Sequence, residues 1–291
     1  MSATPGDHGR AAVQVRFVDV DGVPTRCFMA GKEGAYPILL LHGITLNAEI
    51  WLRNIDALAC DFRVVAPDML GHGYTGPVAI DRGPILARKL AHLRRLVDRL
   101  GFDRFCASGS SYGALVAILL YFDLPTRVDK LIINGSGSSF NTDAQLTAVM
   151  KSTYDDLNDA IGGASAAFWR ARLQKSFFDP GRFPDELLPS LMTCFARSWA
   201  VEAWRKSILD LLDLESLRPF RVLDRLEAIA APSLVVWGRE DRGAIYESAV
   251  EAVRRMPKAR LETFEQCGHF PMIEHSGRYN VLVRDFVAGA S

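Results

Sequence analysis

The 291-residue sequence predicts an α/β fold with a mostly parallel eight-stranded sheet, helices on both faces and an inserted helical lid. Three observations lead to this prediction. Short apolar runs rich in β-branched residues alternate with amphipathic stretches, as in sheets that helices cover on both sides. A strand, a tight turn and a helix succeed one another around Ser111. A long segment in the second half has helical spacing and no convincing strand.

The expected strands fall into two groups, which an interruption separates. Six come before residue 138 and two after residue 223; they are 13–18, 25–29, 38–41, 62–66, 104–108, 130–134, 233–237 and 260–264. Each of the last two strands is followed by a polar turn and a helical pattern. Since the sheet resumes after the interruption, we expect one core made of residues 1–137 and 224–291.

The interruption, residues 138–223, is predicted to be a lid of several short helices. Its apolar residues recur at helical spacing, as in Phe168, Trp169 and Leu173. Prolines at positions 180, 184, 189 and 219 are expected to separate the helices, because proline ends or kinks a helix. Most aromatic side chains of this segment are expected to pack between lid and sheet, and the rest to line an apolar pocket.

Composition and charge restrict the class of partner. The 34 basic and 34 acidic residues cancel, and 49% of the residues are hydrophobic. Nucleic acid or an anionic membrane would call for a basic surface, so neither partner is expected, whereas a small-molecule substrate is. A homo-oligomer is compatible with this composition.

The apolar segments and the cysteines indicate where the protein is located and whether its thiols are reduced. The longest apolar run, residues 114–122, is much shorter than the roughly 20 residues that span a bilayer. The polar N-terminus lacks the apolar stretch of a secretory signal, so a cytoplasmic location is expected. The five cysteines are odd in number and lack paired spacing, which indicates reduced packing thiols and no zinc site.

The strongest chemical signal is the Gly-Ser-Ser-Tyr-Gly sequence at residues 109–113. A serine at a strand-to-helix turn is held on a sharp bend that lifts its hydroxyl clear of the sheet, and its neighbours must be small. We therefore predict Ser111 as the nucleophile. This pattern also arises in ordinary glycine-rich turns, so the partner residues decide the assignment.

A serine hydroxyl needs a general base, and the base needs an orienting carboxylate. Asp241 follows the seventh expected strand and His269 follows the eighth. The carboxyl ends of parallel strands meet at one edge of a sheet, where these distant residues can come together. We predict that His269 takes the proton of Ser111 and that Asp241 holds the imidazole tautomer. Glu240 and His275 are the adjacent rivals.

An oxyanion needs backbone N–H donors that already point at it. The amide of Tyr112, directly after the nucleophile, and the amide of Ile44 are predicted to supply them. His42 is interpreted first as a turn-shaping residue, with a second base as the alternative, and His72 as a loop-ordering residue. Four residues are also expected at the substrate pocket: His42, Ser110, Trp237 and Phe270.

Several short motifs together resemble the α/β-hydrolase superfamily over nearly the whole chain. They are Leu41-His42-Gly43, Pro67-Asp68, Gly71-His72-Gly73, the serine turn, Trp237-Gly238-Arg239-Glu240-Asp241 and Cys267-Gly268-His269. Within the superfamily the chain looks like the meta-cleavage product hydrolases, which break carbon–carbon bonds in vinylogous diketo acids. The motifs similar to that group are Leu223-Asp224-Arg225-Leu226, Val236-Trp237-Gly238-Arg239 and Glu274-His275. This resemblance implies a four-helix lid over the pocket, no metal and no organic cofactor.

The chain departs from that group at three positions. The group usually has asparagine at the position of Ser110 and tryptophan at the position of Phe270. It also has a lid arginine that binds the substrate carboxylate, where this chain has Leu191. Arg197 and Arg205 lie in the same lid segment and are open candidates for that function, with a solvated surface position as the alternative.

The sequence therefore predicts a serine hydrolase that cleaves an ester or a ketone-flanked carbon–carbon bond. Its substrate is expected to be a small, largely apolar or aromatic carbonyl compound. A biosynthetic acyl transferase or cyclase would use the same acyl-enzyme chemistry and is the first alternative. A ligand-binding homologue without catalysis is the second. A haloalkane dehalogenase is excluded, because it would need a carboxylate in place of Ser111.

Overall fold

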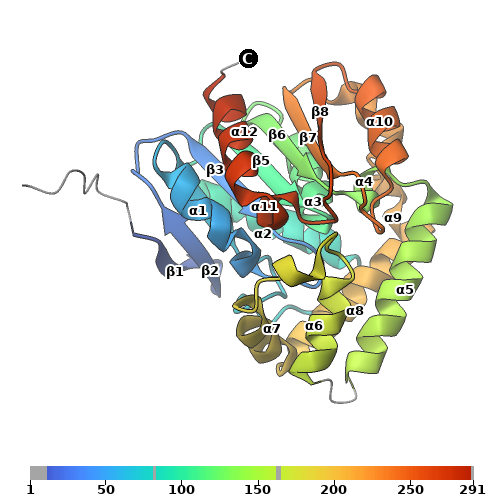
Figure 1. The fold of residues 1–291 in the computed structure, drawn as a ribbon. Helices are drawn as coiled ribbons and strands as arrows, with labels where there is room; N and C mark the ends of the chain where they lie inside the picture. The colour runs from blue at the N-terminus through green and yellow to red at the C-terminus, as the bar shows by residue number, and fades with distance from the viewer. Residues whose placement is uncertain (1–11, 81–82, 162–164, 290–291) are drawn as a thin grey trace, which may run out of the picture.

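An eight-stranded sheet forms the centre of the molecule (Figure 1), and its strands follow the order β1-β2-β4-β3-β5-β6-β7-β8. The computed structural model describes residues 12–80, 83–161 and 165–289. The N-terminal segment before residue 12, including His8, lies outside this range. The strands are β1 Gln14–Val20, β2 Val23–Ala30, β3 Pro37–Leu41, β4 Arg63–Pro67, β5 Phe105–Ser110, β6 Val128–Asn134, β7 Ser233–Gly238 and β8 Ala259–Phe264.

The pairing of the strands confirms the predicted fold class. β1 pairs antiparallel with β2, and β2 pairs antiparallel with β4. All other neighbours, from β4 and β3 through to β8, are parallel. The carboxyl ends of β3, β5, β6, β7 and β8 therefore share one edge of the sheet, where loops bring distant residues together.

Helices cover both faces of the sheet. α1 and α12 pack together on one face, and α2 and α3 pack together on the other. α3 is buried from Tyr112 to Tyr121 because it lies in the middle of the molecule, which accounts for its apolar character all round. The core helices are η1 Ala48–Trp51, α1 Leu52–Ala59, α2 Ile85–Arg99, α3 Tyr112–Asp123, α4 Gly137–Phe140, α10 Tyr246–Arg255, α11 Pro271–Glu274 and α12 Ser276–Ala288.

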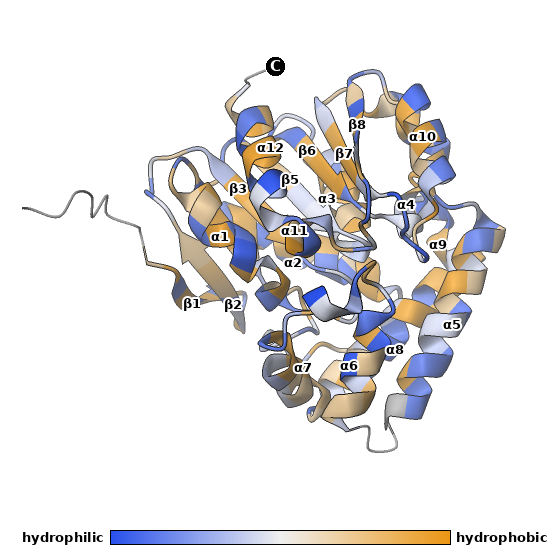
Figure 2. Cartoon of the chain, viewed as in Figure 1, coloured by the Kyte–Doolittle hydropathy of each residue, from blue (hydrophilic) through white to orange (hydrophobic). Residues whose placement is uncertain are grey.

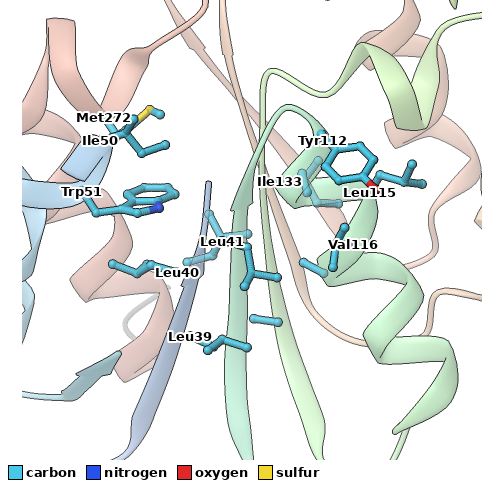
Figure 3. Close-up of a cluster of buried hydrophobic side chains, with 14 of the residues drawn as sticks. Leu39, Leu40, Leu41, Ile50, Trp51, Tyr112, Leu115, Val116, Ile133 and Met272 are labelled. Carbon is cyan, nitrogen blue, oxygen red and sulfur yellow. The ribbon is translucent and has the colours of Figure 1, made fainter. Parts of the chain in front are cut away.

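The hydrophobic core lies on both sides of the central strands. Figure 3 shows Trp51 on one side of β3, and Leu115 and Val116 of α3 on the other. All three side chains are almost completely buried. Strands that are covered on both faces read as continuous apolar runs, as in the Pro-Ile-Leu-Leu-Leu sequence of β3. Figure 2 shows hydrophobic residues along the central strands, whereas the outer helices carry hydrophobic residues on one side and hydrophilic residues on the other.

The segment between β6 and β7 is helical in its described part and lies along the carboxyl edge of the sheet (Figure 1). The division into a core and a lid at residues 138 and 223 stays a prediction. Pro189 does not separate two helices as expected; it occupies the first turn of α7, where the helix amides have no intrahelical acceptor. The helices are α5 Asp143–Ile161, α6 Ala166–Gln174, η2 Pro180–Arg182, α7 Leu187–Phe195, α8 Ser198–Leu212, α9 Leu214–Leu217, η3 Arg218–Phe220 and η4 Leu223–Ala228.

One joint between this lid segment and the core contains a buried lysine. Lys89 of α2 is fully buried, and its Nζ donates to the Ser207 Oγ of α8 at 2.6 Å. Asp210, one turn further along α8, accepts the amide of Ile85 at the start of α2 at 2.7 Å. Burial lowers the pKa of Lys89 to about 7, and the charge of Asp210 offsets this only in part. Keeping the buried amine of Lys89 charged would therefore lower the free energy of unfolding.

Two smaller predictions concern thiols and membranes. The five cysteines form no disulfide, and four of them are buried in the core as expected. Cys60 is exposed at the end of α1, so its description as a packing thiol is wrong. Within the described ranges, no helix has the length and apolar character needed to span a bilayer.

Candidate active site

The turn between β5 and α3 holds Ser111 in a strained conformation. Its φ and ψ angles are 55° and −120°, a combination that costs energy for any residue with a side chain. The flanking glycines are required by space, because a Cβ on Gly109 would lie 2.2 Å from the carbonyl carbon of Gly113. The Ser111 amide donates to the Asn134 carbonyl at 2.8 Å, and Ser136 Oγ donates to the Ser111 carbonyl at 2.7 Å. The predicted elbow is therefore present and fixed on both sides.

An aspartate–histidine pair lies at the same edge of the sheet. Asp241 Oδ2, in the loop after β7, is 2.7 Å from His269 Nδ1, in the loop after β8. The Asp241 side chain is buried, and its Oδ1 accepts the amides of Gly243 and Ala244. Burial would lower the pKa of His269, but the charge and hydrogen bond of Asp241 outweigh it, with help from the charge of Glu274, and the pKa is raised. The pair is thus arranged to stabilise an imidazolium.

The two rivals for these positions are engaged elsewhere. Glu240 Oε2 accepts the amide of Cys267 at 3.0 Å, so this carboxylate holds the loop that precedes His269. His275 Nε2 lies 3.1 Å from the carbonyl oxygen of Gln266. Neither rival lines the pocket that contains His269.

The loop after β3 is held by a buried histidine. His42 Nε2 accepts the amide of Met69 at 2.9 Å, which places its proton on Nδ1, and Nδ1 donates to the Gly43 carbonyl at 2.8 Å. Burial lowers the pKa of His42 to about 3, so the ring is neutral. The carbonyl and N–H of a trans peptide point in opposite directions, so the Ile44 amide is directed away from His42. A Cβ on Gly43 would lie 3.6 Å from Ser111 Cβ, which places this peptide beside the elbow.

The two predicted oxyanion donors belong to one cavity. Tyr112 and Ile44 both line the pocket that also contains Ser111 and His269. Tyr112 is the first residue of α3, so its amide has no acceptor within the helix. His72 Nε2 lies 2.6 Å from the Ile44 carbonyl oxygen, in keeping with a loop-ordering function. The catalytic functions of these residues stay predictions, which this arrangement makes chemically feasible.

Comparison with known proteins connects this geometry to a family. A sequence model of the alpha/beta hydrolase family matches residues 38–280, a range that contains the elbow, the aspartate–histidine pair and the loop after β3. The chain belongs to the alpha/beta hydrolase family. Its site is therefore that of a hydrolase.

The relatives of this hydrolase confirm the resemblance to carbon–carbon bond hydrolases. The chain is 29% identical over 284 residues to a 2-hydroxy-6-oxononadienedioate/2-hydroxy-6-oxononatrienedioate hydrolase of Paraburkholderia xenovorans (strain LB400), covering 94% of each chain. It is 30% identical over 260 residues to a 2-hydroxy-6-oxo-6-phenylhexa-2,4-dienoate hydrolase of Burkholderia cepacia, covering 86% of this chain and 87% of the relative. The solved structure of an enzyme of the latter name from Rhodococcus sp. strain RHA1 matches with a TM-score of 0.80 at 19% identity, covering 96% and 99% of the two chains.

The hydrolase pocket has a volume of about 560 Å³, and its lining is part apolar and part polar. None of the lid's phenylalanine or tryptophan side chains is among its lining residues; they pack against one another, as Trp169 and Phe195 do at 3.6 Å between ring centroids. The expectation of an aromatic lining from the lid is therefore wrong. The lid wall combines aliphatic side chains with hydroxyl and charged groups. The aliphatic ones include Leu146, Val149, Met150, Leu173 and Leu211, and the polar ones are Ser152, Thr153, Asp156, Arg172, Lys175 and Ser176.

Of the four residues expected at the substrate pocket, only Phe270 lines it. His42, Ser110 and Trp237 are fully buried beneath the lining, so their expected contact with substrate is corrected. His42 holds the loop after β3, and Trp237 Nε1 donates to the Ala244 carbonyl at 2.7 Å. Their side chains support the site without reaching into it.

The sequence candidates for a lid cation are also outside the pocket. Arg197 donates to the Gly73 carbonyl at 3.1 Å, and Arg205 pairs with Glu202. Leu191 is buried and does not line the cavity.

Arg172, on α6, is the lid arginine that lines the pocket, and the sequence interpretation missed it. Its side chain is only 12% exposed, its Nε lies 3.4 Å from Asp156 Oδ2, and its guanidinium lies 5.7 Å from the Trp169 ring. Burial lowers the pKa of Arg172, and the charge of Asp156 offsets this in part. A signal was present, because a residue three positions after the buried Trp169 lies on the same helix face.

A metal ion has no obvious place here. In the described part of the chain, no cluster of three or more His, Cys, Asp or Glu side chains is positioned to hold one.

Proposed function

We propose that this chain is a serine hydrolase that cleaves a ketone-flanked carbon–carbon bond of a small carbonyl compound with an anionic group. The observation that carries the proposal is the Asp241–His269 pair, 2.7 Å apart, in one pocket with the strained turn of Ser111. A nucleophile, a base and an orienting carboxylate are together the parts of an acyl-transfer site. The names of the two curated relatives support carbon–carbon cleavage as the reaction.

In the proposed reaction, Ser111 Oγ attacks the substrate carbonyl carbon while His269 takes its proton. The amides of Ile44 and Tyr112 stabilise the resulting oxyanion. The carbon–carbon bond then breaks, its electron pair moves to the carbon conjugated with the second ketone, and the imidazolium returns a proton to that carbon. Water, activated by His269, hydrolyses the acyl-enzyme and releases the carboxylic acid.

The charge of the pocket lining supports an anionic substrate. Three cations line the cavity, and two carboxylates accompany them. Asp241 is engaged with His269, and Asp156 is paired with Arg172. Lys175 and Arg242 have no ion-pair partner within the described residues, so the lining retains an excess of positive charge. A carboxylate on the substrate would balance it.

The experiment compares a vinylogous diketo acid, such as 2-hydroxy-6-oxo-6-phenylhexa-2,4-dienoate, with a p-nitrophenyl ester of similar size. We expect turnover of the diketo acid, with the two acid products identified by mass spectrometry, and none in Ser111→Ala. The loss in that variant should reach several orders of magnitude, because triad residues act as a unit. Turnover of the ester alone would identify an esterase. No turnover and no labelling by a fluorophosphonate would support a ligand-binding protein.

A further inference from the structure

Glu274, the last residue of α11, is a buried carboxylate that the proposed reaction does not use. Its exposed fraction is 7%, and it forms no salt bridge with lysine or arginine among the described residues. Its two oxygens instead accept backbone amides, Oε1 that of Gly268 at 2.8 Å and Oε2 that of Phe178 at 2.9 Å. Burying a carboxylate is costly, and two amide donors recover part of the cost.

The two amides belong to different parts of the molecule. Gly268 immediately precedes His269 in the loop after β8, whereas Phe178 lies in the lid segment between α6 and η2. Figure 1 shows this lid segment running beside α11. One side chain therefore joins the loop of the predicted base to the lid.

The lid segment also contacts the His269 loop directly. The His269 amide donates to the carbonyl oxygen of Ser176 at 2.7 Å. A Cβ on Gly268 would lie 2.4 Å from the same oxygen and 2.8 Å from the nitrogen of Phe178, so only glycine allows this approach. The two segments are thus in backbone contact, with the carboxylate of Glu274 bridging them.

The same lid segment forms part of the pocket wall. Lys175 and Ser176 line the cavity, and Ser176 is the residue whose carbonyl oxygen accepts the His269 amide. The position of the lid wall and the position of His269 are therefore not independent.

We propose that Glu274 is a positioning residue whose carboxylate clamps the lid segment to the His269 loop, so that the base is in place only when the lid wall is seated. The inference rests on the proposed function in one respect, since it takes His269 as the general base. The clamp holds the backbone of the His269 loop, whereas Asp241 holds the imidazole ring. Its charge also favours the imidazolium that forms during the reaction, because it helps to raise the pKa of His269.

The test measures the rate at which a fluorophosphonate labels Ser111 between pH 5 and 9. In Glu274→Gln, we expect a plateau rate about 10- to 100-fold lower, because displacement of a reacting group by about 1 Å has an effect of this order. The midpoint of the acid limb should move to lower pH, since loss of the nearby negative charge lowers the pKa of His269. Arg172, Lys175 and the other pocket cations are the same in every variant.

Two further variants separate the clamp from other effects. Glu274→Asp keeps the charge but is one methylene too short to bridge both amides, so we expect a lower plateau with the wild-type midpoint. Glu265 is exposed, lies directly after β8 and pairs with Arg239. The variant Glu265→Gln should therefore be labelled at the wild-type rate. A residue that served stability alone would change the melting temperature of the protein and leave both the plateau and the midpoint unchanged.

The outcomes are distinguishable. Suppose that the wild type is labelled and that folded Glu274→Gln has the same plateau rate and midpoint. This result overturns the clamp and leaves the proposed function standing. If circular dichroism shows that Glu274→Gln does not fold, Glu274→Asp decides, and a wild-type plateau in that variant overturns the clamp. An unlabelled wild type overturns both the proposed function and the clamp.

Discussion

The two walls of the pocket are held in different ways. On the core wall, the strained backbone of Ser111 is fixed by two hydrogen bonds with the end of β6 and the loop that follows it, and His269 is fixed by a buried carboxylate at 2.7 Å. On the lid wall, Arg172 is held by one ion pair at 3.4 Å, and the side chain of its partner, Asp156, is 38% exposed. The comparison teaches that the reacting groups are placed before a substrate arrives, whereas the groups around the rest of the substrate can adapt.

The largest expected effect comes from breaking the core wall at its carboxylate. Asp241→Asn would donate to His269 Nδ1 and impose the wrong tautomer, so kcat should fall by about 10⁴-fold, as in other triads. Glu240→Gln is the matched control, because the carboxylate of Glu240 accepts the Cys267 amide and does not bind the imidazole of His269. Steady-state turnover of the two variants measures the difference. Equal losses would show that Asp241 is not the orienting acid.

A smaller effect is expected from the lid wall. Arg172→Met keeps the length of the side chain but removes its charge, so KM for a carboxylate-bearing substrate should rise about 10- to 100-fold, the usual value of a charge-assisted hydrogen bond. The value of kcat should change much less, because the core wall is untouched. Arg205→Met, a lid arginine outside the pocket, should leave KM unchanged. A fall in kcat with constant KM would contradict the division between the walls.

The smallest expected effect concerns the joint between the two regions and is read in stability. Between pH 7 and the ordinary lysine pKa of 10.5, the unfolded chain holds a proton on Lys89 that the folded chain lacks, so the free energy of unfolding should rise with pH. Lys89→Met should flatten this rise and stabilise the protein at pH 7 by about 1–3 kcal/mol, because the hydrogen bond to Ser207 compensates only part of the cost of burying the amine. Thermal unfolding at several pH values measures both effects.

Lys258→Met is the control for that comparison, since Lys258 is exposed between α10 and β8, away from the joint. Exposed charges contribute little to stability, so this variant should keep the pH dependence of the wild type. A lower melting temperature for Lys89→Met at every pH would show that the buried ammonium stabilises the joint.

The sequence could predict the features that depend on local patterns. The apolar runs located β3, β6 and β7 to within a few residues, because strands buried on both faces have few alternatives. The order of Ser111, Asp241 and His269 predicted their common edge, because each follows a parallel strand. The core wall could thus be predicted from the order of the strands in the sequence.

The lid wall could not be predicted in the same way. The directions of Arg172 and Lys175 depend on how the lid helices pack, and that packing is a tertiary property that no short motif encodes. Glu274 was noticed only as part of a resemblance, because its two partners lie six and 96 residues away. Aromatic residues in the lid suggested an aromatic lining, whereas they pack against one another and leave the lining to aliphatic, hydroxyl and charged groups.

The parallel pairing of β6 with β7 has a consequence for how such a protein can change. Leu131 pairs with Ser233, so the chain leaves and re-enters the sheet at neighbouring strands on either side of the insertion. The nucleophile is encoded before the insertion, and the acid and base after it. A different lid could therefore be spliced between the two strands while both halves of the reaction centre keep their places. Substrate range can then diversify by exchange of one continuous segment, provided that the new segment supplies a carbonyl oxygen to the His269 amide and an amide to Glu274.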